Sequence, residues 1–377
     1  MRLVLVTQDF PPHRGGIQTY AFELAKRLAV RCEAFAVIAP AEGDTAATDR
    51  GLGFRVLRHG TFDMMVAACA PALAKLVLGE GFDHALHAQW TTLPASLALR
   101  GLRRLKNVTV AAHGRELLLE PWRASKLAQG SYDAVRRQSL TRADRVLAGS
   151  AYTAGLVERL GVARERITVT RYGTDPSRFT PRNATALRAR LGLSGRPVLV
   201  TIARLVERKG IDSVLEALPA VRRAVPDVAY VVVGEGPHRS ELEAAARTAG
   251  VDGAVHFVGS VPDDELPLWY SLGDVFVMPS RSEAPDVEGF GIVYLEAGAC
   301  ERPVVALAAG GVPDAVADGI SGFLVAPGDR AALAARLSEL LLDPARAAEL
   351  GRRGRERVLG ELNWDSVTER TLAALGS

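Results

Sequence analysis

Short apolar runs alternate with longer segments of helical periodicity along the whole chain. In the first half, the β-branched apolar runs that predict strands are Leu3–Thr7, Ala34–Ala39, Val108–Ala112 and Arg145–Ala148. In the second half, they are Val198–Ile202, Ala229–Val233, Ala254–Val258, Val275–Met278 and Pro303–Ala306. Apolar residues recur at the spacing of amphipathic helices in Gln18–Leu28, Ile211–Ala224, Ser240–Ala249 and Asp264–Leu272. This alternation predicts parallel sheets that helices cover on both faces.

The alternation occurs in two consecutive blocks, which predicts two doubly wound α/β domains. A chain of 377 residues suits two domains, because single cores stop growing near ~250–300 residues. Gly, Pro and Asp break the periodicity over Arg171–Gly195, and we place the domain boundary there. We therefore expect an N-terminal Rossmann-like domain over residues 1–172 and a C-terminal one over residues 190–358. Glycine-rich Gly351–Gly360 then precedes a last helix that contains Trp364.

The composition is that of a soluble globular protein, with 48% hydrophobic and 24% charged residues. The apolar start of the chain is expected to be a first strand and not a signal peptide. The apolar segment Met64–Leu78 is interrupted by Pro71 and Lys75, and is too short to cross a bilayer. The cysteines are too few and too scattered for a disulfide framework, so a reduced, cytoplasmic setting is expected: Cys32, Cys69 and Cys300.

Positive charge is concentrated in the first half of the chain. Residues 1–170 contain 23 Lys and Arg against 15 Asp and Glu, with clusters at Arg103-Arg104-x-Lys106, at Arg136-Arg137 and at Arg142 with Arg145. Such clusters are typical either of solvated helix faces or of a surface for an anionic partner, here a phospholipid surface or a phosphorylated acceptor. Nucleic acid is disfavoured, because no aromatic residues are interleaved with the clusters.

Two motifs of the first half follow predicted strands, where ligands of open parallel sheets bind. The segment from Asp9 to Gln18 contains Gly15 and Gly16 at the start of a helix, where backbone N–H groups can approach a phosphate. The alternative is a strand-to-helix turn that needs a positive φ angle. His113 ends an apolar strand and either donates a hydrogen bond in the cleft or is a satisfied structural residue.

Two motifs of the second half carry charge. Arg204 and Lys209 lie five residues apart ahead of a helix and provide the cations that a leaving diphosphate needs, although surface cations are also common. Glu288 and Glu296 are separated by seven residues, with glycines that expose N–H groups at the start of a helix. Carboxylates in this position can accept paired hydrogen bonds from vicinal hydroxyls, or can form salt bridges that flank a turn.

These motifs together resemble glycosyltransferase family 4, whose GT-B fold has two Rossmann-like doubly wound parallel-sheet domains facing across a cleft. The resemblance rests on Gly15-Gly16, His113-Gly-x-Glu, Arg204-x4-Lys209 and Glu288-x7-Glu296, and it covers nearly the whole chain. The most similar members are mannosyltransferases of phosphatidylinositol mannosides and similar lipids. The resemblance also places the last helix, about residues 361–377, back on the first domain.

The resemblance implies a role for each site residue. Gly16, with Gly15, would bind the distal phosphate through its N–H group, and Arg204 and Lys209 would neutralise the leaving diphosphate. Glu296 would bind the donor ribose, with Gly291 and Ile292 at the same helix start. Glu288 would bind the 3- and 4-hydroxyls of the transferred sugar, and His113 its 6-hydroxyl. Asp9 would face the acceptor, and the backbone near Val258 would contact the base. The chain departs from the family at Ser282-Glu-Ala-Pro285, where relatives often carry a glycine-rich segment.

The implied enzyme is a retaining hexosyltransferase that uses a nucleotide-diphosphate sugar, with GDP-mannose favoured, and that needs no metal or other cofactor. Its acceptor would be lipid-linked or a glycan, and it would close its domains over the donor and associate peripherally with the inner face of the cell membrane. The alternatives are a UDP-sugar-dependent glucosyl- or N-acetylglucosaminyltransferase, a nucleotide-sugar epimerase, a dinucleotide oxidoreductase and a non-catalytic protein of polysaccharide assembly. Gly234-Glu-Gly236 lacks the third glycine of a dinucleotide fingerprint, which disfavours the oxidoreductase.

Overall fold

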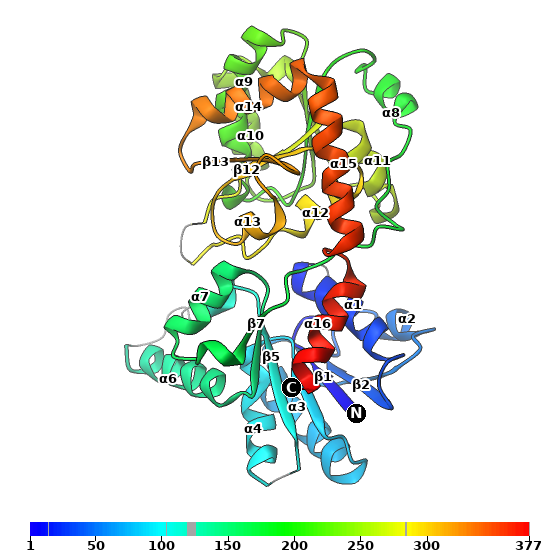
Figure 1. Cartoon of the computed structure of the whole chain (residues 1–377), viewed down its shortest axis with the longest axis vertical. Coiled ribbons are helices and arrows are strands. Elements are labelled where there is room, and N and C mark those ends of the chain that lie inside the picture. Colours follow the sequence, from blue (N-terminus) through cyan, green and yellow to red (C-terminus); the bar gives the residue numbers. More distant parts are fainter. Residues whose placement is uncertain (14, 103, 119–125, 283–284, 377) are drawn as a thin grey trace. The chain divides into compact units, whose positions relative to one another are not determined.

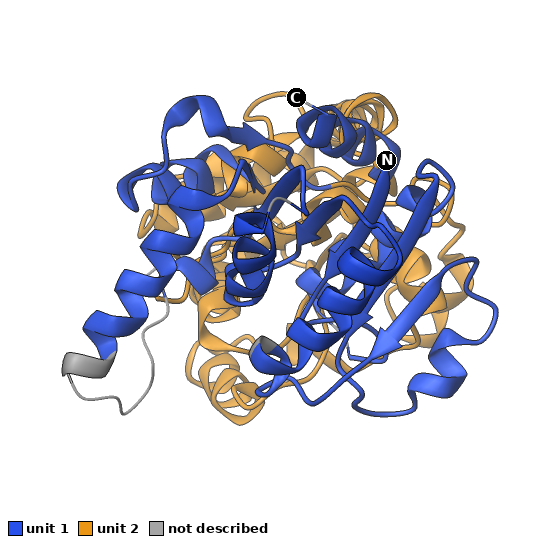
Figure 2. Ribbon diagram, turned by 90° about the horizontal axis from the view of Figure 1, so that it is seen from below, with its two compact units in different colours: residues 1–172, 364–377 blue, residues 173–363 orange. Residues whose placement is uncertain are grey.

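The chain forms two compact α/β units, which are coloured separately in Figure 2. The structure is a computed structural model that describes residues 1–13, 15–102, 104–118, 126–282 and 285–376. The first unit comprises Met1–Tyr172 with Trp364–Ser377, and the second comprises Gly173–Asn363. The second unit thus includes residues 173–189, which the expected boundary at residue 190 leaves outside it. Arg103 of the basic clusters, and Glu283 and Ala284 of the segment that departs from the family, lie outside the described residues.

The described residues of the first unit contain one parallel sheet with the strand order β3-β2-β1-β4-β5-β6-β7. Its strands are β1 (Arg2–Val6), β2 (Ala34–Ala39), β3 (Arg55–Arg58), β4 (His84–His87), β5 (Asn107–Ala112), β6 (Arg145–Ala148) and β7 (Ile167–Val169). Its helices are α1 (Gly16–Leu28), α2 (Thr45–Asp49), α3 (Met65–Ala74), α4 (Leu93–Gly101), α5 (Arg115–Leu118), α6 (Lys126–Arg142), α7 (Ala151–Arg159) and α16 (Trp364–Gly376), with single turns at η1 (Lys75–Gly79), η2 (Trp90–Thr92) and η3 (Arg164–Arg166). The strand order changes direction between β1 and β4, so the site of this unit is expected outside the carboxyl ends of these two strands.

The described residues of the second unit also contain one parallel sheet, with the order β10-β9-β8-β11-β12-β13. Its strands are β8 (Val198–Ile202), β9 (Ala229–Val233), β10 (Val255–Gly259), β11 (Val275–Met278), β12 (Val304–Leu307) and β13 (Gly322–Val325). Its helices are α8 (Thr185–Arg190), α9 (Ile211–Ala224), α10 (Arg239–Thr248), α11 (Leu266–Leu272), α12 (Ile292–Ala299), α13 (Val312–Ala315), α14 (Arg330–Leu342) and α15 (Pro344–Gly360), with single turns at η4 (Glu207–Lys209), η5 (Asp252–Ala254) and η6 (Asp263–Glu265). The direction changes between β8 and β11. The predicted fold class, two doubly wound parallel-sheet domains, is therefore confirmed.

The last helix, α16, belongs to the first unit, and Figure 1 shows it beside α1. Trp364 at its start is buried and lies edge-on to Tyr20 of α1, with 6.3 Å between the ring centroids. Arg370 donates a hydrogen bond to the carbonyl oxygen of Thr170 over 2.8 Å. The apolar face of α16 is thus buried against the first unit, although the chain reaches it from the second.

Four strands were not predicted from the sequence: β3, β4, β7 and β13. Two of them, β3 and β4, contain polar residues and so lack the continuous apolar run that predicts a buried strand. In β4, His87 is buried, and its ring nitrogens are 2.7 Å from the hydroxyls of Thr92 and Ser96. Burial lowers the pKa of His87 to about 3, so it is a neutral core residue. Strand β3, with the sequence RVLR, is partly exposed because it lies at the edge of the sheet.

The glycine-rich segment Gly351–Gly360 precedes the helix that contains Trp364, as the sequence indicated. The segment is helical and forms the second half of α15. A Cβ atom on Gly351 would lie 2.1 Å from the carbonyl oxygen of Glu301, and Gly354 directly faces Gly298 of α12. The glycines therefore let α15 approach α12 closely, and this tertiary contact outweighs their low helix propensity.

The apolar segment Met64–Leu78 forms α3 and the turn η1. Pro71 lies inside α3, and Lys75 begins η1. Within the parts of the chain that the structure describes, no helix combines the length and the apolar character needed to cross a membrane.

Candidate functional site

In the second unit, the carboxyl ends of β8 and β11 bring Lys209 next to Glu288. Lys209 lies in η4, which follows β8 and ends at Gly210. Gly210 has a φ of 69°, and a Cβ atom there would lie 2.1 Å from the carbonyl oxygen of Pro279, directly after β11. Glycine at this position therefore allows η4 to lie against the end of β11.

Glu288 is held by two cations through a single carboxylate oxygen. Its Oε2 atom accepts hydrogen bonds from Lys209 Nζ at 2.6 Å, from Arg208 Nη1 at 2.9 Å and from Ser280 Oγ at 3.4 Å. Its Oε1 atom accepts none from the described residues. Glu288 is only 8% exposed. The carboxylate is thus fixed at one oxygen and keeps the other for a ligand, which suits the binding of sugar hydroxyls.

Burial and charge act in opposite directions on this pair. Burial lowers the pKa of Lys209, although the Glu288 carboxylate opposes this shift. Burial would raise the pKa of Glu288, but the charges of Lys209 and Arg208 outweigh it and hold that pKa below its usual value. Each charge therefore depends on its partner to remain ionised in a buried site.

Arg204 differs from Lys209 in its surroundings. It is exposed, and its guanidinium forms no hydrogen bond or ion pair with the residues that the structure describes. Its charge contributes to the lowered pKa of Lys209, so the two cations act on the same region. Lys209 and Arg208 contact the Glu288 carboxylate, and Arg204 lies close enough to Lys209 to affect its pKa. Together the three cations favour an anion such as a diphosphate.

The start of α12 offers a second anion-binding element beside Glu288. Gly291 caps this helix with a φ of 90°, and a Cβ atom there would lie 2.3 Å from the ring of Tyr294. The backbone N–H groups of Ile292 and Val293 donate no hydrogen bond to the described residues. Free N–H groups at a helix start favour a phosphate.

Glu296, on α12, is held by Tyr270. The hydroxyl of Tyr270 donates to Glu296 Oε2 over 2.5 Å, whereas Glu296 Oε1 accepts no hydrogen bond from the part of the chain that is described. Burial raises the pKa of Glu296, and the Tyr270 hydrogen bond opposes the shift. Glu296 therefore resembles Glu288, with one oxygen fixed and one available for hydroxyls.

On the expectation that Glu296 binds the donor ribose, replacing Tyr270 with phenylalanine should weaken nucleotide binding by about threefold to tenfold, since it removes one hydrogen bond of about 1 kcal/mol from the carboxylate. The ring contacts with Phe179 and Phe276 remain. The pKa of Glu296 should rise further, so the defect should grow as the pH falls. Isothermal titration with the nucleoside diphosphate at several pH values measures both effects, and unchanged affinity at every pH would contradict the role of Tyr270.

Val258, predicted to lie near the base, occupies an irregular position in the edge strand β10. The pairing of β10 with β9 shifts register between Phe257 and Gly259 and skips Val258. Val258 therefore has no partner residue in the β9–β10 register, and an irregularity of this kind can leave a backbone group available to a base edge.

In the first unit, Asp9 lies at the change of strand direction between β1 and β4. Its two carboxylate oxygens accept hydrogen bonds from the side-chain amides of Gln18 and Gln89. Burial raises the pKa of Asp9, and the Gln89 hydrogen bond opposes this. Asp9 thus sits in a polar site that can bind hydroxyl groups.

The turn at Gly15 and Gly16 leads directly into α1. Gly15 has a φ of 162°, which is extended backbone. The turn therefore does not need a left-handed residue at this position, contrary to the alternative that the glycine serves a turn with a positive φ angle. A Cβ atom on Gly16 would meet nothing within 4 Å. The open space in front of Gly16 is compatible with a phosphate at the start of the helix.

His113 follows β5 and is 8% exposed, and both of its ring nitrogens have partners. Nε2 lies 2.6 Å from the carbonyl oxygen of Ala88, and Nδ1 contacts the hydroxyl of Tyr172. The carbonyl can only accept, so Nε2 carries the proton and Nδ1 accepts from Tyr172. In this arrangement, a hydrogen bond from His113 to a sugar hydroxyl requires one of these two contacts to open.

Several residues of these sites were missed by the sequence interpretation. In the second unit, they are Arg208, Ser280 and Tyr270; in the first unit, they are Gln18, Gln89 and Tyr172. Arg208 is adjacent to Lys209, and this proximity could have identified it. Gln89 follows β4, a strand that was not predicted, so no local pattern could place it near Asp9.

The described residues contain no group of three or more His, Cys, Asp or Glu side chains that could hold a metal ion.

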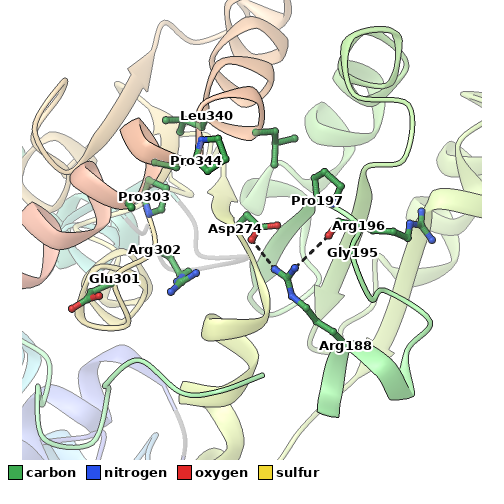
Figure 3. A pocket seen from close by; sticks show the side chains of 13 residues that line it. Arg188, Gly195, Arg196, Pro197, Asp274, Glu301, Arg302, Pro303, Leu340 and Pro344 are labelled. Atoms are coloured by element: carbon green, nitrogen blue, oxygen red, sulfur yellow. Dashed lines mark hydrogen bonds and ion pairs between the residues drawn. The ribbon is translucent and has the colours of Figure 1, made fainter. Parts of the chain in front are cut away.

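A pocket of about 360 Å³ lies at the opposite edge of the second sheet, at the amino ends of β8, β11 and β12 (Figure 3). There Arg188 donates to Asp274 over 2.7 Å and to the carbonyl oxygen of Arg196 over 3.3 Å. These polar groups satisfy one another, so this pocket is a weaker candidate than the Lys209–Glu288 site.

Comparisons with known proteins agree with the geometry. Residues 14–178 match Glycosyltransferase Family 4, and residues 183–357 match Glycosyl transferases group 1. The chain is 38% identical over 373 residues to the GDP-mannose-dependent alpha-(1-6)-phosphatidylinositol monomannoside mannosyltransferase of Mycolicibacterium smegmatis, covering 96% of this chain and 95% of that protein. It is 37% identical to the protein of the same name from Mycobacterium tuberculosis H37Rv, covering 97% and 96%.

Solved structures share the fold at lower identity. Anabaena Alr3699/HepE in complex with UDP has a TM-score of 0.82 at 22% identity and covers 100% of both chains. WaaG, a glycosyltransferase of lipopolysaccharide biosynthesis, has a TM-score of 0.70 at 18% identity and covers 99% of this chain and 98% of that one. The chain therefore belongs to glycosyltransferase family 4 and is a hexosyltransferase with the GT-B fold.

Proposed function

We propose that the enzyme transfers mannose from GDP-mannose to a glycolipid acceptor of the phosphatidylinositol mannoside type. Relatives that share 37–38% of their residues with nearly the whole chain are named for this donor and this class of acceptor. In this proposal, Glu296 binds the ribose, and Glu288 binds the 3- and 4-hydroxyls of the mannose. Asp9 faces the acceptor.

The observation that carries the proposal is the cation group at Glu288. Lys209 and Arg208 are fixed there at 2.6 and 2.9 Å, and Arg204 has no partner among the described residues. In the proposed front-face reaction, the acceptor oxygen bonds to C1 of the mannose as the bond from C1 to the phosphate oxygen breaks. The departing diphosphate takes the bonding electron pair and accepts the proton of the acceptor hydroxyl, so configuration is retained. Arg204, Lys209 and the N–H groups at the start of α12 then stabilise the charge that develops.

Thermal unfolding in the presence of nucleotides tests the choice of donor. GDP at 100 times its dissociation constant is expected to stabilise the protein by about 2.7 kcal/mol. UDP at the same concentration should raise the melting temperature much less. A larger shift with UDP would contradict the GDP-mannose proposal and favour a UDP-sugar.

Product analysis tests retention of configuration and independence of metal. With GDP-mannose and a phosphatidylinositol mannoside, the new linkage should be α, and its rate of formation should be unchanged in EDTA. The cations of the protein already occupy the electrostatic role that a metal would have. Loss of turnover on chelation that added Mg²⁺ restores, or a β linkage, would reject this mechanism.

We further propose that the basic first unit contacts an anionic membrane surface. Arg104, Arg137 and Arg142 are exposed and form no ion pair with the described residues, whereas Lys106 is paired with Asp83 and Arg100 with Asp144. Each basic residue near an anionic surface contributes about 1 kcal/mol. Unpaired arginines are therefore the better candidates for this contact.

Replacing both Arg137 and Arg142 with glutamate is expected to lower binding to phosphatidylserine-containing vesicles by at least about tenfold, because two attractions become repulsions. Co-sedimentation at low and high salt measures this effect. The matched control replaces Arg223 of α9 and Arg247 of α10 with glutamate; both are exposed and form no ion pair with the described residues, and this variant should bind as the unchanged protein does. Equal binding to neutral and anionic vesicles would refute the electrostatic contact.

A further inference from the structure

We propose that Gln89 is a positioning residue that orients the Asp9 carboxylate toward the acceptor hydroxyl, with Gln18 as its counterpart on the other oxygen. This inference rests on the proposed function, which places Asp9 at the acceptor. It adds a residue whose relation to Asp9 is not visible in the sequence, 80 positions away.

The sheet brings Gln89 to Asp9. Strands β1 and β4 are direct neighbours, with Val6 paired to His87, and the strand order changes direction between them. Asp9 and Gln89 follow the ends of these two strands, so both side chains lie at the edge where this fold binds ligands. Gln89 is 6% exposed, which makes its contacts with the protein and not with solvent decisive for its orientation.

The hydrogen bonds of Gln89 fix which end of its amide faces Asp9. Its Oε1 atom accepts from the backbone N–H of Gln8 over 3.2 Å. A backbone N–H can only donate, so this contact identifies the amide oxygen, and the Nε2 group must point to Asp9 Oδ2. The orientation of the amide is therefore set by the backbone that directly precedes Asp9.

Hydrogen bonds also hold the second carboxylate oxygen and the backbone of Asp9. Gln18, from α1, donates through Nε2 to Asp9 Oδ1 over 2.6 Å. The Thr7 hydroxyl accepts from the Asp9 N–H over 3.0 Å and donates to the Asp9 carbonyl over 2.8 Å. Each carboxylate oxygen has two lone pairs and accepts one of these side-chain bonds, which leaves capacity for substrate hydroxyls. The network therefore presents an ionised carboxylate in a fixed orientation.

The surroundings of Asp9 make the Gln89 hydrogen bond important for its ionised form. Burial raises the pKa of Asp9, and the Gln89 hydrogen bond opposes this rise most strongly; His113 and His13 oppose it only where both of their ring nitrogens carry a proton. Arg58 lies nearby but is engaged by Asp49 at 2.7 Å and by the Pro11 carbonyl at 2.8 Å. Loss of the Gln89 amide is therefore expected both to release the carboxylate and to make it easier to protonate.

The test compares Gln89→Glu with Gln89→Leu in the full chain, with GDP-mannose and a phosphatidylinositol mannoside. In Gln89→Glu, two carboxylates face each other, and repulsion should displace Asp9 when both are ionised. At lower pH, one shared proton should restore a hydrogen bond between them. The expected result is a rise in the acceptor KM of about tenfold to a hundredfold near pH 8 that shrinks as the pH falls toward about 5.5. Gln89→Leu should raise the acceptor KM at every pH.

Three controls separate this inference from the alternatives. Gln138→Glu adds the same charge on an exposed position of α6 and should leave the pH profile unchanged. Stabilisation by GDP should be normal in both Gln89 variants, because Gln89 is not among the residues proposed to bind the nucleotide. Asp9→Asn tests the proposed function itself: an unchanged acceptor KM would show that Asp9 does not bind the acceptor.

If Asp9→Asn is defective but Gln89→Glu matches the unchanged enzyme at every pH, the positioning role of Gln89 is wrong and the proposed function stands. A loss in Gln89→Glu that is equal at every pH would also overturn it, since a general structural defect would not follow the titration of the carboxylate pair.

Discussion

Replacement of Lys209 with alanine is expected to lower kcat by about 10²–10³, the effect of removing one preorganised electrostatic stabiliser. The ammonium group is held 2.6 Å from Glu288 in a buried site, so its geometry is fixed before the donor binds. A preorganised charge stabilises the departing diphosphate without reorganisation at the moment of reaction. Water cannot replace it equally well, because solvent reorients during the reaction.

Arg204 provides a comparison within the same site. Arg204→Ala should lower kcat by a similar factor, but should not change the melting temperature, because Arg204 is exposed and has no partner among the described residues. Lys209→Ala should also destabilise the protein, because Glu288 would keep Arg208 as its only cation. Exposed Arg190→Ala is the matched control. Near-normal steady-state turnover of Lys209→Ala would reject the role of the cations.

The second large effect concerns pH and the substitution Glu288→Gln. In the unchanged enzyme, burial lowers the pKa of Lys209, and the Glu288 charge partly counteracts this. The ammonium form is the active one, so activity should fall as the pH rises through that pKa, below the usual value for lysine. Without the carboxylate, only burial and the neighbouring Arg208 and Arg204 charges remain, and all of these lower the pKa further. The alkaline decline should therefore begin at lower pH in Glu288→Gln.

This substitution should also lower kcat/KM for the donor by roughly tenfold to a hundredfold at neutral pH, since a charged acceptor of sugar hydroxyls is lost. The full pH–rate profile of both enzymes separates the two effects. Glu207→Gln, on the exposed side of the same turn, is the control with the same change of charge. An alkaline limb at the same pH in both enzymes would show that Lys209 is not the titrating group.

Much of the fold followed from local patterns. The strands β2, β6, β8, β9 and β11 have the bounds that their apolar runs predicted, because parallel strands covered on both faces are continuous apolar segments. Strands that depart from this rule were missed: β4 contains His84 and His87, and β13 begins at Gly322, where a Cβ atom would lie 2.1 Å from the Val304 carbonyl oxygen. In each case a tertiary contact accommodates a residue that the local pattern disfavours.

In the candidate site, too, some features follow from local sequence patterns and others from tertiary contacts. The sequence by itself determined the two α/β units, the membership of the family and the motifs that contain Arg204, Lys209, Glu288 and Glu296, because hydrophobic periodicity and motif spacing are local properties. Only the tertiary structure decided that Arg208 shares Glu288 with Lys209, and that Gln89 holds Asp9. These partners are about 80 residues apart and meet because the strands that precede them are neighbours in a sheet. The order of strands is set by packing of the whole domain, so no local pattern contains it.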